Sequence, residues 1–196
     1  MSRWQPNARE RLERAALELF AEQGFAATTV PQIAARAGLT TRTFFRHFAD
    51  KREVLFAREG EFPALAARLV ADAPAALGPL ALIARGLETV AATRFEGQRA
   101  YLRARRAVIR ADEGLQEREL RKLAALAEAV GGGFRARGTD ELTATLAAQV
   151  AVTVLGVALD RWLDQDGERP LAELVRDTLR ALRAVAAEPV GRPPGA

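Results

Sequence analysis

The sequence of 196 residues contains no cysteine, one histidine, His47, and one serine, Ser2. Without cysteine, the chain cannot form a disulfide framework or a cysteine-ligated zinc site. A single histidine and a single serine essentially exclude Ser-His and Cys-His nucleophiles. Catalysis would then depend on carboxylates, lysine or tyrosine, and we find no paired-carboxylate or metal-ligand spacing. We therefore expect no metal, no other cofactor and no enzymatic activity.

Acidic residues are missing from one segment of the chain. Between Thr28 and Ala49 there are three arginines, Arg36, Arg42 and Arg46, and no Asp or Glu, although the formal net charge of the whole chain is only +4. The placement of charge is more informative than its total. The segment predicts a local cationic surface.

The sequence also has no segment that resembles a secretory signal, because the first twenty residues carry charge throughout. Its longest uncharged run, Leu142–Leu159, approaches the length of a membrane span but contains three threonines, a glutamine and a glycine. This composition favours a buried helix of a soluble protein. We expect a cytoplasmic protein with no membrane association.

No alternating strand pattern of useful length occurs, and helical periodicity predominates, so we predict an all-α fold of about nine helices. The predicted helices span residues 7–23, 29–37, 40–48, a segment starting at 50, and 79–96, 98–111, 114–130, 140–165 and 170–187. The glycines at 131–133 are expected to interrupt the helical pattern after residue 130. The Pro- and Gly-rich residues 189–196 are expected to form a disordered tail.

Two short helices are predicted close together near the N-terminus. Thr29 and Gln32 have the spacing of a capping box, which predicts a helix start. Gly38 is expected to end this helix after two turns, and Thr40 to cap the next. Two short helices joined by a tight turn and braced by a longer first helix are typical of a helix-turn-helix, in which the second short helix enters the major groove.

The start of the second short helix carries side chains that can read bases. Thr41, Arg42 and Thr43 can reach base edges, and arginine in particular pairs with guanine. Phe44 and Phe48 lie four residues apart on one face, where we expect them to pack against the first helix. The aromatic side chains are therefore expected to hold in place the helix that carries the cationic side chains.

The N-terminal region resembles that of TetR-type transcriptional regulators over about residues 9–57. The resemblance depends on the ordered elements Leu19-Phe20, Gly24-Phe25, Thr28-Thr29-Val30, Ile33-Ala34, Ala37-Gly38-Leu39-Thr40, Thr43-Phe44-Phe45-Arg46-His47-Phe48 and Asp50-Lys51. It implies a helix-turn-helix DNA-binding domain over residues 1–52 and a helical ligand-binding and dimerisation domain over residues 53–188.

The resemblance also implies roles for single residues. By position, Thr41, Arg42 and Thr43 would face bases, and the residues at the DNA backbone would be Thr29, Phe45, Arg46, His47 and Lys51. Phe45 stands where the family usually has a tyrosine whose hydroxyl contacts the phosphodiester. That hydrogen bond is lost here, although Phe45 can still pack on the sugar-phosphate edge.

The last two predicted helices, 140–165 and 170–187, suggest an intersubunit four-helix bundle, because the first of them is apolar on nearly every face. The resemblance likewise implies a homodimer. Gln149, Thr153 and Asp160 form a polar line that would supply either dimer hydrogen bonds or pocket groups.

A ligand pocket is expected among the predicted helices between residues 79 and 165, with Phe95, Tyr101, Arg105 and Gln149 as candidates. Arg105 falls among apolar positions of its helix, and a buried cation needs a partner. Two alternatives follow: an internal salt bridge to a carboxylate, or a pocket group for an acidic ligand.

These patterns favour a dimeric, ligand-responsive repressor that binds double-stranded DNA at a near-palindromic operator and is released by a small molecule. Two other classes are possible. An architectural DNA-binding protein would bind without sequence preference and without a ligand effect. A small helical enzyme would use carboxylates around Arg105 and would show turnover without DNA affinity.

Overall fold

The computed structural model describes residues 7–56, 61–165 and 169–188. Within these residues the chain is helical and contains no strand, which confirms the predicted all-α fold. The chain divides into two compact units: Met1–Leu65 with Gln98–Ala125, and Ala66–Gly97 with Leu126–Ala196. Each unit is described separately.

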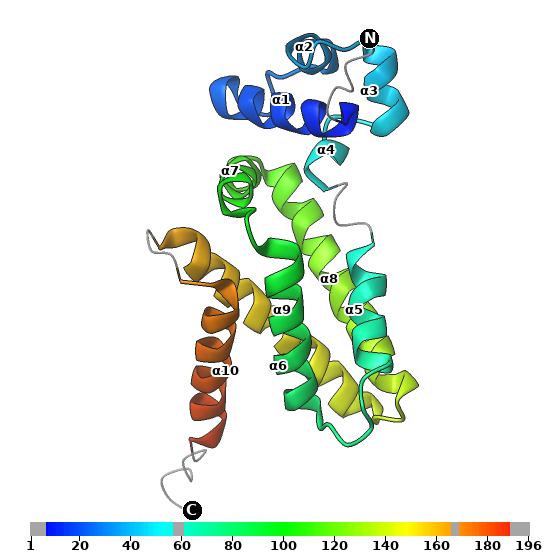
Figure 1. Ribbon diagram of the computed structural model, residues 1–196, viewed down its shortest axis with the longest axis vertical. Coiled ribbons are helices and arrows are strands. Elements are labelled where there is room, and N and C mark those ends of the chain that lie inside the picture. Colours follow the sequence, from blue (N-terminus) through cyan, green and yellow to red (C-terminus); the bar gives the residue numbers. More distant parts are fainter. Residues whose placement is uncertain (1–6, 57–60, 166–168, 189–196) are drawn as a thin grey trace, which may run out of the picture. The chain divides into compact units, whose positions relative to one another are not determined.

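The first unit contains the N-terminal helices. These are α1 (Ala8–Gln23), α2 (Val30–Arg36), α3 (Thr41–His47) and α4 (Glu53–Phe56), followed by α7 (Arg99–Arg110) and the start of α8 (Glu113–Ala136). Figure 1 shows α1, α2 and α3 grouped as three helices whose axes run in different directions. The two short helices and the longer first helix are therefore present as predicted.

Each of these N-terminal helices is preceded by a residue whose side chain accepts a hydrogen bond from an amide of its first turn. Asn7 accepts a hydrogen bond from the Arg9 amide at 3.2 Å. Thr29 forms both halves of a capping box with Gln32. Thr40 accepts from the Thr43 amide at 3.1 Å, and Asp50 accepts from the Glu53 amide at 2.8 Å. These bonds satisfy amides that have no partner within the helix, which fixes where each helix starts.

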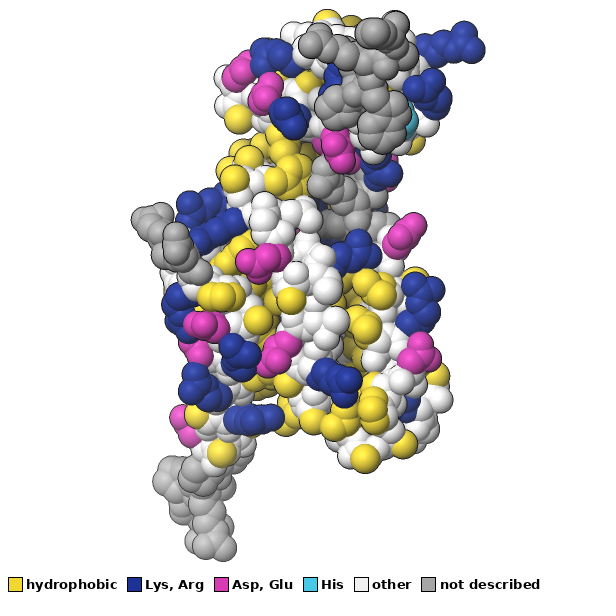
Figure 2. Space-filling model, viewed as in Figure 1, with side chains coloured by type: hydrophobic (Ala, Val, Ile, Leu, Met, Phe, Trp, Pro, Cys, Tyr) yellow, Lys and Arg dark blue, Asp and Glu magenta, His cyan; other side chains and the backbone are white. Residues whose placement is uncertain are grey.

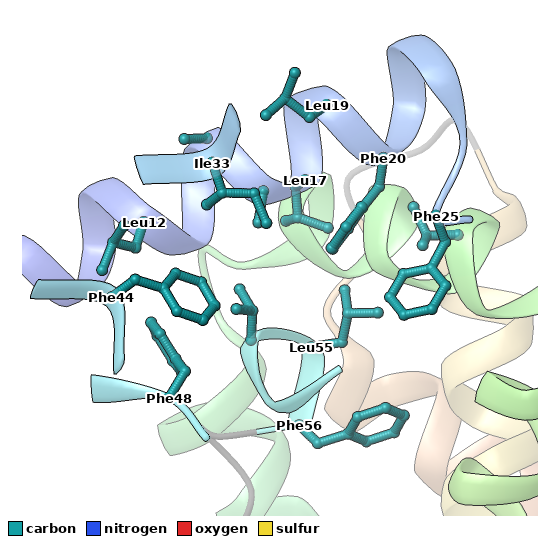
Figure 3. Close-up of a cluster of buried hydrophobic side chains, with 14 of the residues drawn as sticks. Leu12, Leu17, Leu19, Phe20, Phe25, Ile33, Phe44, Phe48, Leu55 and Phe56 are labelled. Atoms are coloured by element: carbon teal, nitrogen blue, oxygen red, sulfur yellow. The ribbon is translucent and has the colours of Figure 1, made fainter. Parts of the chain in front are cut away.

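An aromatic and aliphatic core holds the first unit together. Phe44 is fully buried and its ring centroid lies 5.4 Å from that of Phe48, which is 2% exposed. Figure 3 shows both rings next to Leu12 of α1. At the other end of α1, the rings of Phe20 and Phe25 lie 5.1 Å apart. The predicted packing of the α3 phenylalanines against the first helix is confirmed.

The second unit contains the remaining helices. These are most of α5 (Phe62–Ala71), α6 (Pro79–Val90), the π-helical segment η2 (Ala91–Phe95), the end of α8, α9 (Glu141–Asp164) and α10 (Leu171–Ala187). Helix α9 packs against both α10 and α6. The helix predicted over residues 79–96 thus has an α-helical part and a π-helical end.

The prediction that residues 131–133 interrupt the helix is wrong, because α8 runs through all three glycines. The surroundings of Gly133 show why the helix continues. A Cβ atom at Gly133 would lie 2.6 Å from the Ala67 carbonyl oxygen and 3.1 Å from the Val70 Cβ. The glycine allows α5 and α8 to approach closely instead of ending α8. The helix stops before Gly138, which has the left-handed φ of 82°.

The helix after Asp50 differs from the prediction, and the predicted C-terminal tail cannot be compared with the structure. The helix that starts after Asp50 is only α4, which ends at Phe56, and α5 is a separate helix that the sequence pattern did not resolve. Residues 189–196, predicted to be a disordered tail, lie outside the described residues.

Helix α9 is long and apolar enough to cross a membrane by length and composition alone. Its buried residues include Ala144, Ala151, Val154 and Ala158, which face the interior of the second unit. Core helices of soluble proteins share this composition. We interpret α9 as a core helix and not as a membrane span.

Candidate nucleic-acid interface

The turn between α2 and α3 has the geometry that a helix-turn-helix requires. Gly38 has a φ of 64°, a conformation that favours glycine. The amides of Gly38 and Leu39 donate to the carbonyls of Ala35 and Ala34 at 2.9 and 2.8 Å, which closes the end of α2. Arg11 of α1 donates to the Ala37 carbonyl. Because α1 and the turn are joined by this bond, the second short helix has a fixed starting point.

The start of α3 is exposed at the positions predicted to read bases. Thr41 and Arg42 are exposed and Thr43 is half-buried. The Thr43 hydroxyl lies 3.1 Å from the Thr40 hydroxyl, so one of its hydrogen bonds is made locally. Thr41 and Arg42 are therefore the better placed of the three for an external partner.

Three consecutive α3 residues predicted to lie at the DNA backbone have different environments. Phe45 is 58% exposed and its ring lies edge-on to Phe44, with centroids 5.5 Å apart. Arg46 is exposed. His47 is half-buried, and its Nε2 has no hydrogen-bond partner within the described part of the chain. Because this nitrogen is itself buried, it is not open to an external partner in this arrangement.

Thr29 and Lys51 complete the predicted backbone set. Thr29 is exposed at the start of α2, where its hydroxyl is used in the capping box. Lys51 is half-buried, and its ammonium donates to the carbonyl oxygens of Phe25 at 2.7 Å, Ala26 at 3.2 Å and Thr28 at 2.8 Å. The sequence predicted a phosphate near this ammonium, whereas the structure places three carbonyl groups around it.

Fewer arginines contribute to the cationic surface than the sequence predicted. Arg36 forms ion pairs with Glu22 at 2.7 Å and with Glu18 at 3.6 Å. Its hydrogen bonds hold the pKa of the Glu22 carboxyl below the ordinary value. Among the described residues, no ion pair involves Arg42 or Arg46. Figure 2 shows basic side chains projecting from this unit beside acidic ones. Arg42 and Arg46 thus carry the net positive charge of the exposed α3 surface.

Arg9 and Glu13 of α1 form a polar contact that the sequence pattern did not predict. Glu13 of α1 is only 2% exposed. It accepts a hydrogen bond from the Arg9 Nε at 3.2 Å, and the Arg9 guanidinium lies 5.8 Å from the Phe48 ring centroid. The i, i+4 spacing of Arg9 and Glu13 was visible in the sequence. The Phe48 ring that Arg9 approaches is distant along the chain.

The four candidate pocket residues are divided between the units. Tyr101 and Arg105 belong to α7 of the first unit, whereas Phe95 in η2 and Gln149 in α9 belong to the second. Tyr101 packs partly buried against the core of the first unit. Phe95 is half-buried and Gln149 is exposed. Their role as pocket residues stays a prediction.

Of the two alternatives for Arg105, the salt bridge is present in the structure. The guanidinium is 8% exposed and its Nη2 lies 2.9 Å from the Glu119 carboxylate. Its Nε donates to the Leu55 carbonyl at 2.6 Å, and the Phe56 ring centroid lies 5.1 Å away. The buried cation therefore has the partners that burial requires.

Two short capped helices, a glycine turn and an exposed, acid-free leading edge on the second helix define a helix-turn-helix protein. Residues 13–57 match the family described as bacterial regulatory proteins, tetR family. The N-terminal region of the chain is therefore similar to that of tetR-family regulatory proteins.

Sequence similarity to curated regulators covers about a quarter of the chain. The HTH-type transcriptional regulator TcmR of Streptomyces glaucescens is 59% identical over 46 residues, which cover 24% of this chain and 20% of that relative. The aligned segment thus spans only a fifth of TcmR.

Solved structures resemble the chain over more of its length. SmeT, the repressor of the Stenotrophomonas maltophilia multidrug efflux pump SmeDEF, has a TM-score of 0.60 at 20% identity, over 92% of this chain and 90% of that one. Thermus thermophilus FadR, a TetR-family repressor in complex with lauroyl-CoA, has a TM-score of 0.52 at 22% identity, over 96% and 98%. At these identities the likeness establishes the fold.

Proposed function

We propose that this protein is a DNA-binding transcriptional regulator that acts as a ligand-responsive repressor at a near-palindromic operator. The observation that carries the proposal is the exposed edge of α3, where Thr41 and Arg42 are accessible beside the exposed Arg46. Short polar and cationic side chains at the start of a helix-turn-helix recognition helix are suited to base edges in the major groove.

Thr41, Arg42 and Thr43 are proposed to read bases, and Thr29, Phe45, Arg46 and His47 to contact the DNA backbone. Arg46 is exposed and supplies charge. Contacts to the backbone set affinity and register, whereas base contacts set sequence preference. Loss of the usual tyrosine hydroxyl at Phe45 therefore weakens positioning without removing sequence readout.

We propose that the protein is a homodimer through α9 and α10. A line of exposed side chains runs along one face of α9, comprising Leu142, Leu146, Gln149, Thr153, Val157 and Asp160. The three apolar members are 70%, 57% and 44% exposed, and Val185 of α10 is 68% exposed. Aliphatic side chains aligned at helical spacing favour burial against a second copy. Two copies would present their α3 helices to half-sites about 34 Å apart.

A small-molecule effector is proposed for the helical region after the helix-turn-helix, which we place at residues 53–188, after a DNA-binding domain over residues 1–52. FadR of Thermus thermophilus in complex with lauroyl-CoA supports a ligand-binding role for this fold. Ligand binding would shift the equilibrium between DNA-binding and released states. An acidic effector loses the support of Arg105, because this guanidinium is paired with Glu119. A regulator of this kind would act in the cytoplasm.

Selection of bound duplexes from a random library, followed by competition at fixed salt, tests the proposal. We expect one near-palindromic sequence to be enriched, and its affinity to exceed that of random duplex by at least about a thousandfold. Equal affinity for all duplexes would instead indicate an architectural protein. Turnover of a small molecule without any DNA affinity would indicate an enzyme, although the family is one of transcriptional regulators.

A further inference from the structure

The Lys51 ammonium is fully occupied by contacts within the first unit. A protonated lysine has three N–H donors and no acceptor. Three carbonyl oxygens, from Phe25, Ala26 and Thr28, lie 2.7, 3.2 and 2.8 Å from Nζ. The face of the Phe25 ring also lies close, with its centroid 4.4 Å from Nζ. No N–H of this side chain remains for a phosphate oxygen in this arrangement.

The three carbonyls belong to the loop between α1 and α2, which folds around Thr28. Gly24 opens the loop with a φ of 84°. The Thr28 side chain is buried, and its hydroxyl donates to the Gly24 carbonyl at 2.8 Å. One backbone bond, from the Thr28 amide to the Phe25 carbonyl at 3.3 Å, also crosses the loop. These bonds leave carbonyl groups converging on one point, and Lys51 occupies that point.

Lys51 links two parts of the helix-turn-helix because of its position along the chain. It lies between α3 and α4, one residue after Asp50, which caps α4. The loop that it contacts leads directly into Thr29, the N-cap of α2. The ammonium therefore joins the end of the α3 segment to the beginning of α2 by charge-assisted hydrogen bonds, which are stronger than neutral ones.

We propose that Lys51 is a positioning residue that fixes the α1–α2 loop, and with it Thr29 and α2, relative to α3, and that it makes no phosphate contact. This inference depends on the proposed DNA-binding function. It assigns Lys51 to the internal geometry of the helix-turn-helix and leaves backbone charge neutralisation to Arg46. Its consequences for DNA binding differ from those of a phosphate contact.

The salt dependence of DNA binding separates the two roles. Each phosphate-neutralising cation contributes about one to the slope of log affinity against log salt. Lys51→Met is expected to weaken binding of the selected operator by about tenfold or more, the loss that corresponds to hydrogen bonds with a charged group, without changing this slope. Arg46→Met is the matched phosphate variant and should lower the slope by about one.

Amide hydrogen exchange of the free protein measures, without DNA, how firmly Lys51 holds the α1–α2 loop. In Lys51→Met the Thr28 and Thr29 amides should exchange about ten- to a hundredfold faster. Arg52→Met removes the adjacent exposed cation, which makes no hydrogen bond or ion pair among the described residues, and should leave these amides unchanged.

Lys51→Arg keeps the charge and provides a second variant if Lys51→Met is poorly folded. Its planar fork cannot direct three donors at three converging carbonyls, so faster loop exchange is expected in this variant also. A phosphate contact would tolerate this change with little effect.

Two results would overturn the inference. One is a slope reduced by about one in Lys51→Met together with unchanged exchange of the loop amides. The other is wild-type operator affinity in a folded Lys51→Met protein, which would show that the Lys51 contacts do not position the helices for DNA binding. A wild-type chain that binds no duplex at any salt concentration would overturn the proposed function itself, and is distinguishable from both.

Discussion

The Nε of Arg105 in α7 donates a hydrogen bond to the carbonyl oxygen of Leu55 in α4 at 2.6 Å. Leu55 lies in α4 and is buried. The same guanidinium pairs with Glu119 of α8. A single side chain thus holds α4 to two later helices of the first unit.

Replacement of Arg105 is expected to destabilise the first unit. Arg105→Ala would remove the donor to the Leu55 carbonyl and one of the two cations paired with the largely buried Glu119 carboxylate, and breaking comparable buried pairs costs about 3 kcal/mol. Urea unfolding followed by circular dichroism measures the loss. Arg121→Ala is the control, because its pair with Glu117 is exposed on both sides, and should change stability by less than about 0.5 kcal/mol. An equal, small effect of both changes would contradict the structural role of Arg105.

The Glu119 pair makes stability depend on pH. Burial raises the pKa of the Glu119 carboxyl, but attraction to Arg105 and Lys122 outweighs burial, so the pKa lies below the ordinary value of 4.5. A lowered folded-state pKa contributes stability above the unfolded pKa, and this contribution is lost as the pH falls through the folded value. Glu119→Gln should therefore be less stable than wild type at pH 7, and the difference should shrink below about pH 4.5. Urea titrations of wild type and Glu119→Gln at several pH values measure this convergence, and a constant difference would contradict it.

Local patterns predicted the first helices well because their determinants are adjacent in sequence. The caps at Thr29, Thr40 and Asp50 each use a residue three positions further on, so spacing alone identifies them. The exposed edge at Thr41 and Arg42 follows from the same helix start. The environments of Lys51 and Arg9 were not predicted, because they depend on the loop at residues 25–28 and on Phe48, which the chain brings close only after folding.

The glycines at residues 131–133 show the same limit. Sequence reasoning treats consecutive glycines as a break because each costs helix stability, about 1 kcal/mol relative to alanine. The structure retains the helix because close packing of α5 against Gly133 compensates for that cost. Whether a glycine ends a helix or permits a close contact depends on a partner helix that local sequence does not identify.

Substitution of Gly133 should separate these two effects. Gly133→Ala would place a Cβ 2.6 Å from the Ala67 carbonyl oxygen, so α5 must move, at a cost of about 1 to 3 kcal/mol. Gly132→Ala is the matched control, since its Cβ would meet only the end of the Arg135 side chain at 3.9 Å. It should stabilise the protein by up to about 1 kcal/mol through helix propensity. Thermal unfolding of the two variants tests the opposite signs, and stabilisation by both would contradict the close approach.

Arg42 provides the sharpest test of base reading. Arg42→Ala should weaken binding of the selected operator by about 1 to 3 kcal/mol and relax the preference at one base pair of each half-site. The measurement is a competition series in which each operator position is changed in turn. Arg52→Ala is a suitable control, because Arg52 is equally exposed but lies outside α3. A uniform loss on every duplex would indicate that Arg42 contacts only the backbone.

The apolar line on α9 predicts how the protein associates. Leu146→Asp would place a carboxylate in the middle of the proposed dimer interface, where it would be desolvated without a partner. We expect the variant to be monomeric by light scattering at concentrations where wild type is dimeric, while its helical content is unchanged because Leu146 is 57% exposed in the single chain. Leu120→Asp changes another exposed leucine, on α8, and should leave the dimer intact.

Because a near-palindromic operator requires two copies, Leu146→Asp should also reduce operator affinity to roughly that of a single half-site. Dimers that persist in Leu146→Asp would exclude this face of α9 as the interface.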